Sequence, residues 1–252
     1  MSFSPDHGEA RVRPSPNCGP RKLSGRPDIL LLHYTGMATG DEAERWLCRP
    51  DSEVSCHYIV HEDGRIVQMV PEAMRAWHAG ASCWEGEADV NSRSIGIEIV
   101  NGGHPANLPP YPDRQIDAVI ALAQDIVERH AIKPSRVLGH SDVAPGRKID
   151  PGEHFPWERL AESGIGLYEP EGPRGEILLR SGMRGQPVEA MQALLSLYGY
   201  DVANTGEYDD RTRTVVQAFQ MHYRKSCIDG EADRATMERL YHLVNKAKSD
   251  PA

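Results

Sequence analysis

The segment at residues 137–152, VLGHSDVAPGRKIDPG, concentrates side chains that could bind a metal ion. It contains His140, Lys148 and Asp150, and its prolines and glycines prevent a continuous helix or central strand. We therefore expect a structured loop that leaves a short strand at residues 137–138. Zinc binds imidazole nitrogen and carboxylate oxygen at about 2.0–2.2 Å, so its ligands must converge tightly. The Pro-Gly turn would bring His140 and Asp150 together, although this spacing alone also fits a polar surface loop.

His33 is a third candidate ligand, because it ends an apolar run at the rim of a predicted sheet. With His140 and Asp150 it completes a set of two histidines and one carboxylate. Three protein ligands and an open position are typical of catalytic zinc sites, where zinc lowers the pKa of bound water to about 7. Asp142 is a rival for the third position, since a strand would place it on the same face as His140. We prefer Asp150 because the intervening turn lets it close the site.

Hydrolysis at such a site also needs a base for the water and a positive group for the oxyanion. Glu98 lies among alternating isoleucines and is the candidate base; its alternative role is an exposed strand carboxylate. Lys148 is the candidate cation for the oxyanion, and its alternative role is a solvated loop lysine.

The other histidines are weaker candidates. His57 and His61 have the i, i+4 spacing of a helical zinc motif, but residues 54–60 have the pattern of a strand. Their Cα atoms would then be roughly 13 Å apart, too far to share a metal easily. We expect His57 to be a hydrogen-bonded core histidine. We treat a further group as structural or solvated: His104, His130, His154, His222 and His242.

Strands and helices are mixed in the part of the chain that holds these groups. The apolar runs and alternation predict strands at residues 28–33, 55–60, 65–70 and 94–100, with an Asp-Gly hairpin turn between the second and third. Helices are expected at residues 41–47, capped by Asp41 or Thr39, at 115–130, and from Trp157 to Leu160. This mixture predicts an α/β domain with a mixed central sheet flanked by helices.

The amino-acid composition changes at two places along the chain, which indicates boundaries between segments. Residues 1–27 are rich in Pro, Gly and Arg and predict an N-terminal arm before a first domain at 28–168. Residues 169–175 have the composition of a linker. Apolar periodicity then predicts helices at 188–198, 212–222 and 236–244, which would form a small three-helix domain at 176–248.

Composition excludes several classes of protein. The chain has 252 residues, 39% of them hydrophobic, and a net charge of −9, which disfavours a nucleic-acid partner. The five cysteines are dispersed and suggest a reducing compartment rather than a disulfide framework. No signal peptide, lipoprotein anchor or membrane span is apparent. We therefore expect a monomeric cytoplasmic protein, with the periplasm or cell envelope as the alternative.

Five ordered motifs, spread over residues 27–165, carry a family resemblance. They are LHYT at residues 32–35, CHYI at 56–59, AWHAG at 76–80, NSRSIGIE at 91–98 and GHSD through KIDPG at 139–152. Together they resemble the zinc-dependent N-acetylmuramoyl-L-alanine amidases, which include phage T7 lysozyme, the bacterial recycling amidases and the peptidoglycan recognition proteins. The phage branch has tyrosine in place of Cys56 and cysteine in place of Asp150, so the chain is more similar to the bacterial branch.

This resemblance implies a T7 lysozyme-like fold and hydrolysis of the amide between N-acetylmuramic acid, or its 1,6-anhydro form, and L-alanine. It implies Zn²⁺ as cofactor, peptidoglycan or muropeptides as partners, and a role in cell-wall turnover and recycling. It also implies that His33, His140 and Asp150 bind the zinc. Glu98 would be the general base, and Lys148 would stabilise the transition state. The resemblance also implies that three further residues line the substrate groove: His78, Asn91 and Tyr34.

The tail is similar to the helical peptidoglycan-binding domain of many wall enzymes, which would tether the catalyst to polymer. The resemblance rests on LRSGMRG at residues 179–185, AFQ at 218–220 and Asp229-Gly230. Two other functions remain as alternatives. The chain could be a non-catalytic recognition module, although that version lacks a full ligand set, or a zinc peptidase that cuts within the stem peptide.

Overall fold

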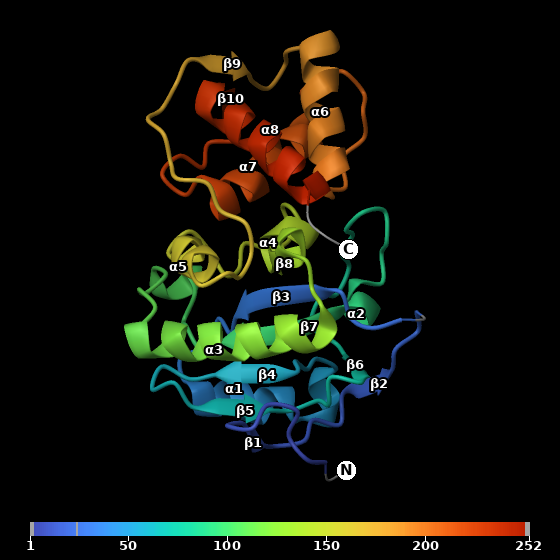
Figure 1. Ribbon diagram of the computed structural model, residues 1–252, viewed down its shortest axis with the longest axis vertical. Coiled ribbons are helices and arrows are strands. Elements are labelled where there is room, and N and C mark those ends of the chain that lie inside the picture. Colours follow the sequence, from blue (N-terminus) through green and yellow to red (C-terminus); the bar gives the residue numbers. More distant parts are fainter. Residues whose placement is uncertain (1–2, 24, 250–252) are drawn as a thin grey trace.

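The central sheet has six strands in the order β1-β5-β4-β7-β3-β8. The computed structural model describes residues 3–23 and 25–249 (Figure 1). Only the β4·β5 pair is antiparallel, and it forms the hairpin expected from Asp63-Gly64. The predicted mixed α/β sheet is therefore confirmed. Its strands are β1 (Arg11–Val12), β3 (Ile29–Tyr34), β4 (Tyr58–Val60), β5 (Ile66–Gln68), β7 (Ser94–Ile99) and β8 (Val137–Gly139).

Strand β3 brings the candidate ligand His33 to one edge of the sheet. Its four apolar residues, 29–32, are completely buried, as expected for a strand covered on both faces. β3 pairs in parallel with β7, and His33 lies opposite Glu98 in the register. Because parallel strands deliver their carboxyl ends to the same edge, the two side chains reach the same side of the domain.

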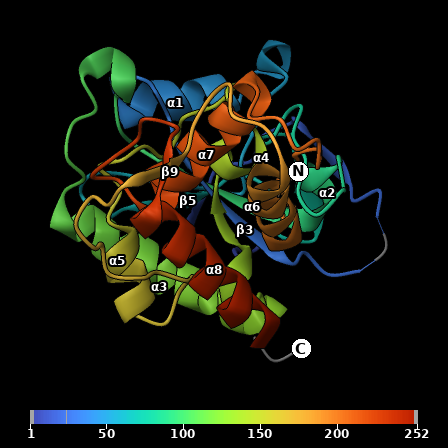
Figure 2. The ribbon, with the colours of Figure 1, turned by 90° about the horizontal axis from the view of Figure 1, so that it is seen from above.

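Helices cover both faces of the sheet. Helix α3 (Asp113–His130) packs on one face through an apolar stripe that contacts Leu30, Leu32 and the isoleucines of β7. Helix α1 (Gly40–Leu47), capped by the Thr39 hydroxyl, packs on the other face. Figure 2 shows these two helices on opposite sides of the molecule. The remaining helices of this part are η1 (Pro50–Ser52), α2 (Val90–Arg93), η2 (His104–Ala106), η3 (Pro134–Arg136), α4 (His140–Val143) and α5 (Trp157–Glu162).

The C-terminal part is the expected helical unit, which lies beyond α4 and β8 in Figure 1. It contains α6 (Gln186–Tyr198), α7 (Asp210–Tyr223) and α8 (Arg234–Ser249). A small antiparallel pair that the periodicity did not predict, β9 (Ile177–Leu179) with β10 (Ala232–Asp233), closes the unit. One hydrophobic core joins this unit to β3, β8 and α4. Trp84 lies in that core at Gly199, where a Cβ atom would lie 2.4 Å from the indole and the φ of +136° also favours glycine.

The N-terminal segment packs along the first domain. β1 extends the central sheet, and β2 (Cys18–Pro20) pairs with β6 (Met74–Ala76). Arg21 donates to the backbone carbonyls of Glu72, Asn91, Ser92 and Ser94. These contacts connect the arm to the segment before β6, to helix α2 and to the start of β7.

Two local expectations were wrong. The segment after β8 is not all loop, because residues 140–143 form the one-turn helix α4, in which the Asp142 carboxylate accepts from the Gly139 N–H. Strands β4 and β5 are also shorter than predicted, because pairing occurs only at residues 58–60 and 66–68. Within residues 3–23 and 25–249, no helix combines the length and apolar character that crossing a bilayer requires.

Glu72 should make the protein sensitive to acid. Burial alone would raise the pKa of Glu72, but hydrogen bonds from His130, Arg129 and Tyr58 hold it at about 2. This value lies below the ordinary 4.5, so the stabilisation is complete above that pH and is lost as pH falls toward 2. We expect about 3 kcal/mol of unfolding free energy to depend on this ionisation.

Denaturant unfolding at a series of pH values would measure this effect. The Glu72→Gln variant should be less stable than the unmodified chain at neutral pH, and the difference should shrink steadily on acidification. Exposed Glu62 provides a matched control, because Glu62→Gln should leave the pH profile unchanged. A constant difference between Glu72→Gln and the parent across the acid range would contradict the assignment.

Candidate active site

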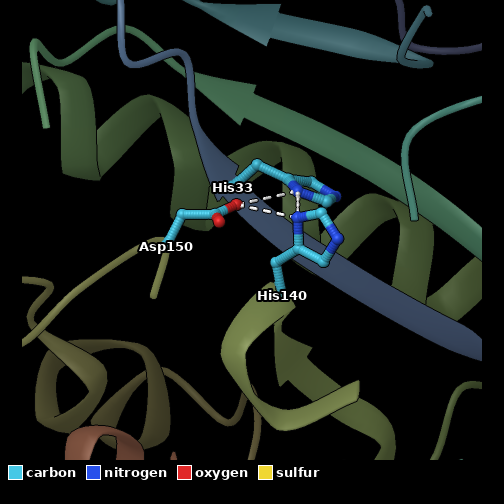
Figure 3. A group of neighbouring side chains, drawn as sticks. All are labelled: His33, His140 and Asp150. Atoms are coloured by element: carbon cyan, nitrogen blue, oxygen red, sulfur yellow. Dashed lines mark hydrogen bonds and ion pairs between the residues drawn. The ribbon is translucent and has the colours of Figure 1, made fainter. Parts of the chain in front are cut away.

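Three side chains from distant parts of the chain converge at one edge of the sheet. His33 is the next-to-last residue of β3, His140 begins α4, and Asp150 follows in the loop (Figure 3). The Nδ1 atoms of the two histidines are 2.9 Å apart, and each lies 3.0 Å from Asp150 Oδ2. All three side chains are buried, and each offers one atom to a group that could hold a metal ion.

The contacts of His140 Nε2, the ring nitrogen that faces away from His33 and Asp150, indicate the tautomer of His140. Nε2 lies 2.9 Å from the Ala79 carbonyl oxygen, which only accepts hydrogen bonds, and 3.2 Å from Arg147 Nη2, which only donates them. The shorter contact assigns the proton to Nε2, and in the neutral ring Nδ1 then presents a lone pair toward His33 and Asp150. Metal-bound histidines commonly donate their second N–H to a carbonyl in this way.

A chain of hydrogen bonds sets the tautomer of His33 by the same reasoning. The Ser94 hydroxyl donates to the Val90 carbonyl at 2.7 Å, so it is free only to accept from His78 Nε2, 3.3 Å away. His78 Nδ1 is then an acceptor, and His33 Nε2 donates to it at 2.9 Å. Burial lowers the pKa of His33 to about 4, which keeps its ring neutral. His33 Nδ1 therefore also presents a lone pair.

The centre thus has the donor chemistry of a cation site. Two imidazole lone pairs point at each other and at a carboxylate oxygen, an arrangement that is repulsive unless a positive charge lies between them. Burial by itself would raise the pKa of Asp150, and positive charge on the adjacent imidazoles lowers it. A cation held between the two lone pairs would act on the carboxylate in the same direction and keep it ionised. Neutral histidines with an ionised carboxylate are the form in which these residues bind metals.

Glu98 and Lys148 line the same cavity, which has a volume of about 450 Å³. The buried Oε2 atom of Glu98 has no hydrogen-bond partner in the described part of the chain. Burial raises the pKa of Glu98 well above its usual range, the Asp150 charge raises it further, and Lys148 opposes the shift. A carboxylate of raised pKa can accept a proton from water near neutral pH.

The three residues expected in the substrate groove have different positions. Tyr34 lines the cavity, and its hydroxyl lies 3.1 Å from His104 Nδ1. His78 lines the cavity as well, although its ring nitrogens are used by the chain of hydrogen bonds described above. Asn91 is buried and is not among the residues that line the cavity. Its Oδ1 accepts from the backbone N–H groups of His78 and Ala79, so it supports the segment that carries them.

Several groups that matter here were missed by the sequence reasoning. Trp46 and Trp77 line the cavity, and 41% of the Trp46 surface is exposed. A tryptophan in the helix predicted at residues 41–47, directly after Glu44 and Arg45, was a usable signal for a binding surface. The Ala79 carbonyl and Ser94 had no such signal, because their roles depend on contacts between distant segments.

A second cluster with metal-ligand residue types is better explained as an ion-pair network. Asp41, Glu44 and His61 each offer one atom within 4.8 Å of the others. Both oxygens of buried Glu44 are already paired with arginines, Oε2 with Arg11 and Arg13 and Oε1 with Arg65. These contacts neutralise the carboxylate and leave little attraction for a metal ion.

Gly96→Ala is expected to weaken metal binding without touching a ligand. A Cβ atom on Gly96 would lie 2.5 Å from His78 Nδ1, so the ring that fixes His33 must move. Loss of such an outer partner typically weakens metal affinity by about 10–100-fold. Zinc titration against a competing chelator would measure the change. Gly19→Ala, which meets nothing within 4 Å, is the control, and equal affinities in both variants would contradict the role of His78.

Comparison with known proteins agrees with this geometry. Residues 23–153 match the family model described as N-acetylmuramoyl-L-alanine amidase. The chain belongs to this amidase family. Residues 184–240 match a peptidoglycan binding domain family. The resemblance drawn from the five motifs and from the tail is therefore confirmed.

Two known relatives are similar in sequence to the amidase over different parts of its length. N-acetylmuramoyl-L-alanine amidase AmiD of Escherichia coli K12 is 39% identical over 240 residues, which cover 89% of this chain and 85% of the relative. The 1,6-anhydro-N-acetylmuramyl-L-alanine amidase AmpD of Enterobacter cloacae is 33% identical over 169 residues, covering 60% of this chain and 88% of AmpD. The first similarity extends over both parts of the amidase.

Solved structures share its fold. The complex of Escherichia coli AmiD with anhydro-N-acetylmuramic acid-L-Ala-D-gamma-Glu-L-Lys has a TM-score of 0.75 at 38% identity and covers 90% of this chain and 91% of the other. AmpDh3 of Pseudomonas aeruginosa has a TM-score of 0.73 at 30% identity and covers 97% and 99%, respectively. The predicted amidase fold is thus confirmed.

Proposed function

We propose that this amidase hydrolyses the bond between the lactyl group of N-acetylmuramic acid, or its 1,6-anhydro form, and L-alanine. The observation that carries the proposal is the convergence of two imidazole lone pairs and one carboxylate beneath a cavity that also holds Glu98. The related AmiD structure contains an anhydromuramyl tripeptide, and an AmpDh3 structure contains an anhydromuramic pentapeptide. We therefore propose peptidoglycan fragments as the substrate class.

The proposed cofactor is zinc, held by His33, His140 and Asp150. The donor set fits zinc, since nitrogen and carboxylate ligands with one open position are its catalytic pattern. When bound, zinc would supply Lewis-acid polarisation of the scissile carbonyl and would make water acidic enough to lose a proton near neutral pH.

The protein residues would do the rest of the chemistry. Glu98 accepts the proton of the attacking water, whose oxygen adds to the lactyl carbonyl carbon. The Lys148 ammonium stabilises the oxyanion that develops there. As the carbon–nitrogen bond breaks, Glu98 returns the proton to the departing L-alanine nitrogen. Tyr34 and His78 lie along the cavity wall, and Asn91 supports the wall through the backbone.

We assign catalysis to residues 28–168 and attachment to peptidoglycan to residues 176–248, joined by the linker at 169–175 and preceded by the arm at 1–27. Attachment would raise the local concentration of substrate around the cavity. We also propose that the amidase acts in the cytoplasm, because its five cysteines are all free. We propose in addition that it acts as a monomer. Light scattering and cell fractionation test these two points, with a periplasmic or envelope-bound pool as the contrary result for location.

The deciding experiment for the reaction is digestion of intact sacculi beside purified anhydromuropeptides, with products identified by mass. Release of an intact stem peptide and a free muramoyl sugar is expected. Cleavage between two amino acids would identify a zinc peptidase instead, and binding without any product would identify a recognition module.

A further inference from the structure

Asp142 connects the candidate metal centre to the helical unit. Its carboxylate is fully buried, with 0% exposure, and it accepts three hydrogen bonds. The Gly139 N–H donates to Oδ2 at 2.8 Å from the same turn. The Tyr200 hydroxyl donates to Oδ1 at 2.5 Å, and His222 Nδ1 donates to Oδ2 at 2.7 Å. Tyr200 and His222 both belong to the C-terminal unit, so two of the three donors cross the interface.

The turn that Asp142 holds also places the ligands. Helix α4 has four residues, and a single turn is not stable by its own hydrogen bonds. His140 is its first residue, and the Ser141 N–H donates to the Asp150 backbone carbonyl at 3.0 Å. The position of this turn therefore sets both the His140 ring and the backbone of Asp150.

The two donors from the helical unit are themselves held in place. His222 is 2% exposed and is stacked between Trp157, at a centroid distance of 3.6 Å, and Tyr223, at 3.8 Å. Tyr200 packs edge-on against Trp84 at 5.1 Å. Trp157 and Trp84 come from the first domain, so side chains of the first domain fix the rings of both donors. A buried carboxylate that loses one donor is left partly unsatisfied, and the turn that depends on it must shift.

We propose that Tyr200 and His222 are positioning residues for the metal centre, acting through Asp142 on helix α4. The helical unit then has a second role besides attachment to peptidoglycan, because it completes the geometry in which His140 and Asp150 meet His33. This inference rests on the proposed metal site and deepens it. It concerns the affinity for the ion rather than recognition of the polymer.

Zinc affinity of full-length variants tests the proposal. Tyr200→Phe and His222→Phe should each bind zinc about tenfold more weakly than the parent, by analogy with the loss of outer partners of metal ligands. Competition with a chromophoric chelator gives the affinity. With cobalt in place of zinc, the visible absorption of both variants should also change, because it reports ligand geometry.

Tyr208→Phe is the matched control. Its hydroxyl donates to the Gly230 carbonyl oxygen at 2.8 Å, inside the helical unit and in the same buried core. It should lose some thermal stability but keep the parent's zinc affinity and cobalt spectrum. If Tyr200→Phe and His222→Phe behave in the same way, the contact is merely structural and the proposal is overturned.

Two other outcomes of the experiment can be distinguished from a failure of the positioning role. Failure of the unmodified chain to bind zinc would refute the proposed metal site itself, before the variants are considered. If His222→Phe does not fold, Tyr200→Phe decides the question alone, because it removes a single oxygen atom and keeps the ring against Trp84.

Discussion

Glu98→Ala should bind zinc as the parent does and lose nearly all turnover. Glu98 is not among the three converging ligands, so removing it leaves the ion's contacts in place. Without it, no carboxylate accepts the proton of the attacking water, and loss of a general base typically costs about 10²–10⁴-fold in rate. Zinc content by atomic absorption and product release from an anhydromuropeptide would measure the two effects separately.

Two further variants sharpen this test. Glu98→Gln keeps the size of the side chain but accepts no proton, so it should be as inactive as Glu98→Ala. Glu128→Ala removes an exposed carboxylate from α3 and should retain full activity. A Glu98→Ala enzyme that still turns over would exclude Glu98 as the base and would leave water activation to the ion alone.

His140→Ala should lose both zinc and activity. The substitution removes one of three ligands and the N–H that the ring donates to the Ala79 carbonyl. We expect the affinity to fall by more than the roughly 100-fold upper range for an outer partner. The measurement is chelator competition, together with metal analysis after dialysis.

The matched control is His242→Ala, because His242 is exposed on α8, away from the cavity lining. It should keep its zinc and its rate. A His140→Ala variant that retained stoichiometric zinc would rule out the ligand set, and one that retained turnover without zinc would rule out metal-assisted hydrolysis altogether.

The candidate site was accessible from the sequence to the extent that its residues lie on elements with strong local patterns. The apolar run before His33 and the alternation around Glu98 placed both side chains at strand ends, and β3 and β7 put them in register. The Pro-Gly turn correctly predicted that Asp150 folds back toward His140. These features depend on periodicity and turn chemistry, which act between neighbouring residues.

The roles of the outer partners could not be predicted in that way. The family resemblance implies only a place in the groove for His78, but its hydrogen bond to His33 spans 45 residues and depends on the position of β6 beside β7. His222 is one of the histidines expected to be structural or solvated; it is structural, but its partner is a carboxylate 80 residues away. Asp142 had been considered as a ligand and instead caps the turn that carries one.

The sequence alone therefore determined the strands of the central sheet other than β1, the main helices, the residues proposed as metal ligands and the family. Each of these depends on short-range patterns or on motifs that can be compared directly. The tertiary structure decided which nitrogen of each histidine faces the proposed metal site, that a helical turn carries His140, and that Tyr200 and His222 of the C-terminal unit contact that turn. These properties arise from hydrogen bonds between buried groups far apart in the chain, for which neighbouring residues provide no signal.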